Sequence, residues 1–141
     1  MKNDKKVRIG CASAFWGDTS TAAKQLVEKG DLDYLVFDFL AEVTMSILAR
    51  AKLKDPDKGF TSDFLTQIEP LLPMIKQKEI KILTNAGGIN PTSCRAILER
   101  AIKKAGIDLK VAIVTGDNLF LELPRIAGLG ITELDTGNPF P

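Results

Sequence analysis

Polar side chains gather in four short segments of the chain, and each segment follows an apolar run that is typical of a β-strand. The segments are ASAFWGDTS (12–20), DFLAE (38–42), TNAGGINP (84–91) and TGDNL (115–119). Their carboxylates, amides and hydroxyls could bind an ion or transfer protons as general acids and bases. The candidate catalytic and binding residues are Ser13, Trp16, Asp18, Asp38, Glu42, Asn85, Gly87, Gly88, Asn90, Asp117 and Asn118.

Histidine does not occur anywhere in the sequence. Its absence excludes Ser-His-Asp and Cys-His machinery within this chain, as well as metal sites built on imidazole. The sequence has no GxxxxGK[ST] motif, and no GxGxxG motif follows the first strand-like run, so the common nucleotide fingerprints are missing. The chemistry is therefore left to carboxylates, amides, hydroxyls, lysines and backbone N–H groups.

The segment TNAGGINP holds more glycine, asparagine and proline than a simple turn needs. Gly87 and Gly88 allow positive φ angles and a close approach of another molecule to the backbone. A helix begins at the end of the segment, with Asn90 as its predicted N-cap. Its free N–H groups favour an anion, such as a phosphate or a carboxylate. The alternative is a tight turn in which Asn85 and Asn90 hydrogen-bond to their own backbone. We favour the anion cradle, with donors near Gly87, Gly88 and residues 91–93.

The segment DFLAE places two carboxylates near one strand end. Asp38 ends the predicted strand, and Glu42 follows four residues later, so both can face the same edge of a sheet. We predict that they form the catalytic pair. Together with Asp18 and Asp117 they could instead bind Mg²⁺ through oxygen ligands, and the sequence indicates no other cofactor. In the simplest alternative, Glu42 only stabilises the first turn of a helix.

For each remaining candidate, the sequence supports a structural role at least as well as a ligand-binding role. Trp16 is the only tryptophan, and it could wall a ligand pocket or cover the end of the core. Asp18 and Asp117 are typical helix caps or turn residues, with ligand binding as the second interpretation. Cys94 falls in the first turn of a predicted helix, which lowers a thiol's pKa. Without a histidine partner we expect a buried thiol there, and Cys11 and Cys94 lack the CxxC or zinc spacing, so both should be free.

Apolar periodicity assigns the elements that must position these residues. Strand-like runs alternate with helical stripes, an order that is typical of βαβ units and a parallel sheet. We predict a three-layer, Rossmann-like α/β fold with about four parallel strands and helices on both faces. In such a sheet all four polar segments lie at the carboxyl edge, where ligands bind. The predicted strands are 7–11, 32–37, 80–84 and 109–114, and the predicted helices are 19–29, 40–53, 61–75 with a break at Pro70 and Pro73, and 91–105.

Length and composition indicate a single α/β domain over residues 1–141. Apolar residues make up 45% and charged residues 26%, as in ordinary globular proteins. The net charge of +1 argues against nucleic acid as the main partner. No apolar run approaches the roughly 18 residues of a membrane span, and the start MKNDKKVRIG lacks a signal-peptide core. We therefore expect a cytoplasmic protein.

Three stretches together resemble the N-terminal region of the acyclic terpene utilisation protein family. They are GCASAFWGDTSTAAKQLVEKGDLDYLVFDFLAEVTMSILARAK, ILTNAGGINPTSC and VAIVTGDNL, which span about residues 7–120. The chain has Phe39 where the family resemblance predicts tyrosine, which would remove a hydroxyl from the polar edge.

The resemblance implies a catabolic enzyme, or part of one, that acts on an organic acid or an acyl-CoA thioester in the breakdown of acyclic terpenoids or branched acids. Family members are longer, so the resemblance also implies that this chain is the N-terminal portion of a larger domain and is inactive alone if other site residues lie beyond it. An unpaired sheet edge would then favour self-association or a companion subunit. The alternative is a binding or assembly subunit without chemistry of its own, which the missing histidine favours.

Overall fold

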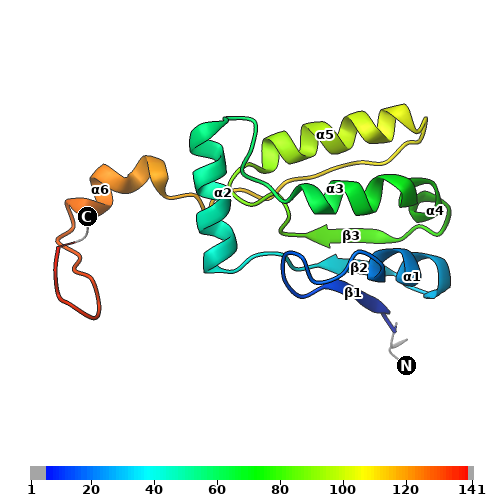
Figure 1. Cartoon of the computed structure of the whole chain (residues 1–141), viewed down its shortest axis with the longest axis horizontal. Helices are drawn as coiled ribbons and strands as arrows, with labels where there is room; N and C mark the ends of the chain where they lie inside the picture. Colours follow the sequence, from blue (N-terminus) through cyan, green and yellow to red (C-terminus); the bar gives the residue numbers. More distant parts are fainter. Residues whose placement is uncertain (1–5, 140–141) are drawn as a thin grey trace, which may run out of the picture.

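A computed structural model describes residues 6–139 of the chain, which fold around one small parallel sheet (Figure 1). The sheet has three strands in the order β1-β2-β3. The strands are β1 (Ile9–Ser13), β2 (Tyr34–Phe37) and β3 (Lys81–Thr84). The helices are α1 (Ala22–Lys29), α2 (Glu42–Lys54), α3 (Ser62–Ile68), η1 (Glu69–Leu71), α4 (Leu72–Gln77), α5 (Pro91–Lys104), η2 (Phe120–Glu122) and α6 (Leu123–Ala127). None of the helices within residues 6–139 is long and apolar enough to cross a bilayer.

The α/β class and the parallel pairing of β1 with β2 and of β2 with β3 confirm the sequence-based prediction. The predicted fourth strand at 109–114 is wrong, because these residues belong to no strand ladder. Leu109 and Val111 still pack against the core, whereas Val114 is 94% exposed. The alternation in the sequence reflects an extended segment with one side inward. This segment does not pair with β3, so the outer edge of β3 is not paired within the described residues.

Helices cover one face of the sheet, not two. Register places Gly10, Leu35 and Ile82 side by side, and Leu26 of α1 lies against Gly10. Phe64 of α3 packs edge-on against Phe37, with ring centroids 5.2 Å apart, so α1 and α3 share this face.

The side chains of the opposite face are exposed or half-buried, and we call this surface the open face. Ile9 and Leu83 there are 65% and 51% exposed. The expected second helical layer is therefore not present in the part of the chain that the structure describes. Both successive crossovers run in the same direction along the sheet, so their helices lie on the same side. The sequence pattern does not reveal this order of strands. The open face consists of Ile9, Cys11, Tyr34, Val36, Lys81 and Leu83.

Aromatic packing fixes the covered face. The rings of Phe37 and Phe39 stack with centroids 5.7 Å apart, and Phe64 meets both at steep angles. All three side chains are at most 2% exposed. Such aromatic pairs add about 0.5–1.5 kcal/mol beyond the burial of their area. This cluster holds the end of β2, and with it the segment that carries Asp38, in a fixed position.

Prolines and caps set the helix boundaries as the sequence predicted. Pro70 and Pro73 split one long apolar stripe into α3, η1 and α4, because proline lacks an N–H group and clashes with the preceding turn. Asn90 caps α5, and its side chain accepts from the amide of Ser93. The predicted cap of the first helix is wrong, since α1 starts after Thr21 without a side-chain cap.

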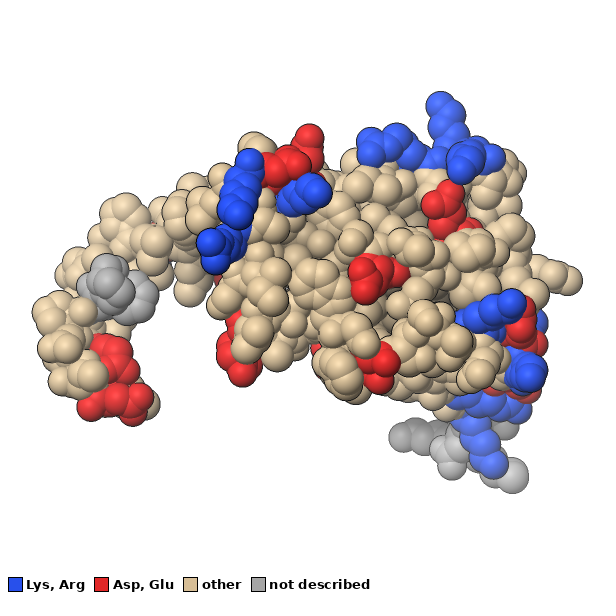
Figure 2. Space-filling model, viewed as in Figure 1, with Lys and Arg blue, Asp and Glu red and all other residues tan. Residues whose placement is uncertain are grey.

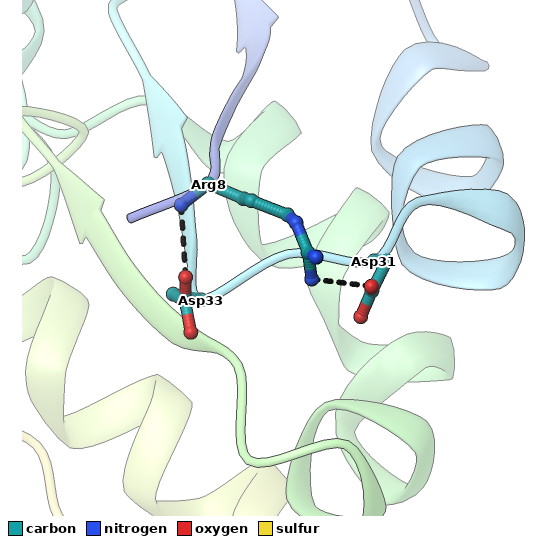
Figure 3. A network of polar contacts seen from close by, with 3 residues as sticks. All are labelled: Arg8, Asp31 and Asp33. Carbon is teal, nitrogen blue, oxygen red and sulfur yellow. Dashed lines mark hydrogen bonds and ion pairs between the residues drawn. The ribbon is translucent and has the colours of Figure 1, made fainter. Parts of the chain in front are cut away.

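Charged side chains at the amino edge of the sheet form hydrogen bonds and an ion pair that stabilise the fold. The amide of Arg8 donates to Asp33, 2.8 Å away, and its guanidinium pairs with Asp31 (Figure 3). The ammonium group of Lys78 donates to the carbonyls of Val27 and Glu28, at 2.7 and 2.9 Å, and so caps the end of α1. Lysine at a helix C-terminus complements the helix dipole. The charged groups at this edge are therefore engaged in structural contacts.

Candidate functional site

Two candidate residues meet at the carboxyl edge, where β2 and β3 end side by side. The amide nitrogen Nδ2 of Asn85 donates to Oδ1 of Asp38 over 2.7 Å. The Asn85 oxygen accepts from the amide of Phe39 over 2.8 Å. Both side chains are exposed. Asn85 thus orients the Asp38 carboxylate across 47 residues of sequence, while the Asp38 side chain stays exposed.

Ser13 joins the same edge from β1, but as a structural link. Its hydroxyl donates to the backbone carbonyl of Asp38 over 3.1 Å, and the Asp38 amide donates to the Ser13 carbonyl over 3.1 Å. Ser13 is 3% exposed. The ends of all three strands are therefore tied to one point, and Asp38 lies at the centre of these contacts.

The two glycines of the TNAGGINP segment are needed for close packing of the chain on itself. Gly88 has a φ of +52°, whereas the φ of Gly87 is not positive, so the positive angle that the sequence allowed at both occurs only at Gly88. A Cβ atom there would lie 2.5 Å from Leu48 Cδ1 and 2.6 Å from the carbonyl oxygen of Gly59. A Cβ atom on Gly87 would lie 2.9 Å from Pro91. This packing explains both glycines whether or not the segment also binds a ligand.

Asn90 is the most fully engaged residue of this segment. It is 7% exposed, accepts from Ser93, and donates to the carbonyls of Pro56 and Lys58 over 2.9 and 2.7 Å. These bonds fix the start of α5 to the connection between α2 and α3. They give Asn90 a structural role that the turn interpretation anticipated only in part.

Most amides of the segment already donate within the protein. The amides of Gly88, Ile89 and Asn90 bond to Asn85, Gly59 and Gly87, respectively. Among the described residues, the amides of Gly87 and Thr92 have no such acceptor, since the first N–H groups of a helix lack intrahelical partners. The anion cradle predicted from the sequence is thereby narrowed to these two donors.

Three residues support this segment in a role that the sequence did not indicate. Thr61 is completely buried, and both its amide and its hydroxyl donate to the carbonyl of Ala86. Lys52 of α2 donates to the carbonyl of Ile89 over 2.8 Å. Gly59 has a φ of +105°. The sequence KDPDKG (54–59) is typical of a polar linker. Only Gly59, at its end, indicates a fixed turn.

The segment after β1 holds Trp16 and Asp18. Trp16 is half-buried and packs against the core, so the core-covering interpretation accounts for its position. Asp18 accepts from the amide of Ala14 over 3.0 Å, as a turn residue does. An open hollow of about 420 Å³ separates this segment from Asp63 and Gln67 of α3. The Gln67 oxygen is buried there without a hydrogen-bond partner.

The other candidates do not join the Asp38–Asn85 pair through any described contact. Glu42 is exposed in the first turn of α2. Asp117 and Asn118 are exposed beyond the last core residue, and Asn118 accepts from the amide of Phe120. Among residues 6–139 no three acidic or cysteine side chains lie close enough to hold a metal ion. The four carboxylates considered for Mg²⁺ are therefore not gathered into one group.

Phe39 departs from its expected position, whereas the two cysteines match their prediction. Phe39 belongs to the core and is 1% exposed, so a tyrosine hydroxyl at this position would not lie on the polar edge as its motif suggested. Both cysteines are free, as predicted. Cys94 is buried, and burial raises the pKa of its thiol to about 11. It therefore stays protonated at neutral pH.

Comparison with known proteins places the chain in a family. The family model described as acyclic terpene utilisation family protein AtuA matches residues 7–141, almost the whole chain. The chain shows no significant similarity to a curated protein or to a solved structure. Because the family model covers far more than half of the sequence, the chain belongs to the acyclic terpene utilisation (AtuA) family, as its loop motifs predicted.

Proposed function

We propose that the chain is a catabolic enzyme, or the N-terminal part of one, that acts on a small anionic substrate at the carboxyl edge of its sheet. The substrate class is an organic acid or an acyl-CoA thioester from the breakdown of acyclic terpenoids or branched acids. The observation that carries this proposal is the Asp38–Asn85 pair, which holds an exposed carboxylate in a fixed orientation. Membership of the acyclic terpene utilisation family supports the pathway class.

In this proposal Asp38 is the general base or acid. A carboxylate can exchange a proton with a substrate when it lies within hydrogen-bond reach and its orientation is fixed. Asn85 supplies the orientation through its 2.7 Å bond, and the amide of Leu40 donates to the same oxygen over 3.3 Å. Glu42, exposed on the adjacent turn of α2, is the second proton-transfer group.

The anionic part of the substrate would bind at the start of α5. The amides of Gly87 and Thr92 are the donors that remain there, and the helix dipole adds a favourable field for negative charge. Asn85 lies two residues before Gly87, so the cradle and the Asp38 carboxylate lie on neighbouring parts of one edge. The carboxylates would then face the reacting part of the substrate, away from its charge.

The alternative function is a binding or assembly subunit without chemistry of its own. The open face favours this candidate, because it leaves Ile9 and Leu83 exposed on a surface that parallel sheets usually cover. The absence of histidine favours it too. Turnover of a substrate by the folded protein would decide for the enzyme.

The test begins with thermal-shift screening against CoA thioesters, short carboxylates, nucleotides and Mg²⁺. Calorimetric titration with the best carboxylate or thioester then compares the wild type with Asn85→Ala and Asp38→Asn. We expect Asn85→Ala to weaken binding about tenfold, which corresponds to about 1.4 kcal/mol. Asp38→Asn keeps a hydrogen-bonding side chain of the same size, so it should abolish turnover while leaving affinity within about threefold.

Asn138→Ala is the matched control, because this asparagine is exposed and far along the chain from the carboxyl edge. It should bind and turn over as the wild type does. Circular dichroism must show that each variant is folded, since Asn85 also accepts a backbone bond. Unchanged affinity and turnover in folded Asn85→Ala and Asp38→Asn would contradict the proposal.

A further inference from the structure

The open face is an apolar surface without a cover in the described chain. Its central rows are Ile9–Tyr34–Lys81 and Cys11–Val36–Leu83, set by the register of the three strands. Only Lys81 is charged, and its ammonium group lies over the Tyr34 ring at 5.3 Å from the centroid. Parallel sheets normally bury both faces. A surface of this kind is typical of a protein–protein contact.

Residues 115–139, which we call the arm, carry apolar side chains that have no surface of the body to pack on. The arm extends away from the sheet and its helices, beyond α2 (Figure 1). Every hydrogen bond and ion pair described for its residues joins two residues of the arm itself. Most of its large apolar side chains are exposed, at 71% for Phe120, 89% for Leu121 and 96% for Leu134. A helix as short as α6 is not stable in water without a packing partner.

Charge favours contact between the arm and the rest of the chain, which we call the body (residues 1–114). The arm has four acidic side chains and one basic side chain, a net charge of −3. The body has 18 basic and 14 acidic side chains, a net charge of +4. Opposite net charges steer two surfaces together and favour their association.

The position of these charges points to a second copy. Figure 2 shows acidic side chains at the tip of the arm, and basic side chains with some acidic ones among them at the far end of the body. The last turns of α1, α4 and α5 contribute Lys29, Lys76, Lys103 and Lys104 to the body's positive charge. The arm of the same chain extends away from that end. A second copy in the reversed orientation can place its acidic tip there.

We propose that the arm of one copy packs its apolar side chains on the open face of a second copy, in a reciprocal two-fold dimer. Each copy then gives one arm and receives one, so the contact closes on itself and forms no filament. The inference is independent of the proposed enzymatic function, since it uses no residue of the Asp38–Asn85 pair.

The first experiment measures mass in solution by sedimentation equilibrium on the full chain. We expect a dimer, and the double variant Phe120→Ser, Leu121→Ser should raise the dissociation constant at least about tenfold, because burial of two large apolar side chains is lost. Leu53→Ser is the matched control. Leu53 is 86% exposed on α2, outside both the arm and the open face, so its replacement should leave the dissociation constant unchanged.

The second experiment identifies the two surfaces by a disulfide. Cys11 lies exposed on the open face, whereas Cys94 is buried and its thiol has a raised pKa, so Cys94 does not compete. Under mild oxidation, Leu121→Cys should give a covalent dimer on non-reducing electrophoresis. The wild type and the variant that combines Leu121→Cys with Cys11→Ser should not.

Three results would overturn the proposal. A monomer at all concentrations would show that the arm has no partner copy. A disulfide within one chain, seen as a monomer of altered mobility, would show that the arm folds back on its own open face. A dimer that the Phe120→Ser, Leu121→Ser variant does not weaken would show that the copies meet through another surface.

Discussion

The body and the arm contain similar kinds of residue but bury them differently. All buried hydrophobic residues of the described chain lie between Ala12 and Ile102. The arm has none, although leucine, isoleucine and phenylalanine recur along it. Both regions form helices after a proline near the first turn, as in α5 and α6. Only in the body does such a helix pack into the core, to which α5 contributes Cys94 and Ile102.

This difference shows which part of the structure local sequence determines. Proline at a helix start and glycine after its end act on the backbone within a few residues, so α6 forms where its own residues favour it. Burial requires a second surface, which the body supplies from β1, β2 and β3. The arm must find such a surface elsewhere, and the open face of a second copy meets that need.

The largest difference between the regions should appear when phenylalanine is truncated in each. Phe37 is 1% exposed and contacts two other rings, whereas Phe120 is 71% exposed. Phe37→Ala should lower the free energy of unfolding by about 3–5 kcal/mol, through lost burial and a cavity. Phe120→Ala should change it by less than about 0.5 kcal/mol. Urea unfolding followed by circular dichroism measures both values.

The measurement belongs at a low protein concentration, where the proposed dimer is dissociated. Raising the concentration should then stabilise the wild type more than Phe120→Ala. The wild type associates more tightly, and association stabilises the folded state by mass action. A large loss for Phe120→Ala at every concentration would mean that the arm packs on its own body.

The sequence predicted the body's elements well, because their signals are local. Three strands, the split at Pro70 and Pro73 and the Asn90 cap each depend on residues within one or two turns. The fourth strand and the second helical layer were wrong, since a ladder at 109–114 and a cover for the open face depend on neighbours that periodicity does not identify.

For the candidate site, the sequence could predict the edge but not the contacts within it. Because parallel strands end at the same edge, Asp38 and Asn85 were expected to lie near each other, and the structure shows their hydrogen bond. The buried support from Thr61 and Lys52 was not predicted, since neither residue type signals a bond to a backbone carbonyl 25 or 37 residues away.

A second comparison separates backbone strain from packing at three glycines. Gly88, Gly106 and Gly130 all have positive φ angles, of +52°, +67° and +66°. A Cβ atom would meet Leu48 at 2.5 Å from Gly88, but would meet nothing within 4 Å from Gly106 or Gly130. Gly88→Ala should therefore cost about 2–4 kcal/mol, the sum of left-handed backbone strain and overpacking. Gly106→Ala should cost only the strain, about 1–2 kcal/mol.

Gly130→Ala completes this series in the arm. It has the same strain as Gly106→Ala, but its cost cannot exceed the local stability of the arm, so the unfolding midpoint of the body should not move. Equal losses for Gly88→Ala and Gly106→Ala would show that Leu48 and Gly59 yield to a methyl group. A loss for Gly130→Ala as large as that for Gly106→Ala would show that the arm unfolds together with the body.

The smallest expected difference concerns two asparagines that cap turns. Asn90 is 7% exposed and holds Ser93, Pro56 and Lys58, whereas exposed Asn118 accepts only from Phe120. Asn90→Ala should cost about 2 kcal/mol, because α5 loses its cap and two carbonyls lose their donors. Asn118→Ala should cost less than about 0.5 kcal/mol.

Asn90→Ser restores the cap alone, so its urea midpoint should lie between those of the wild type and Asn90→Ala. If Asn90→Ser matched Asn90→Ala, the cap would contribute nothing, and the bonds to Pro56 and Lys58 would account for the whole loss. If Asn118→Ala instead cost as much as Asn90→Ala, the arm would be as firmly held as the body, and the contrast between the two regions would fail.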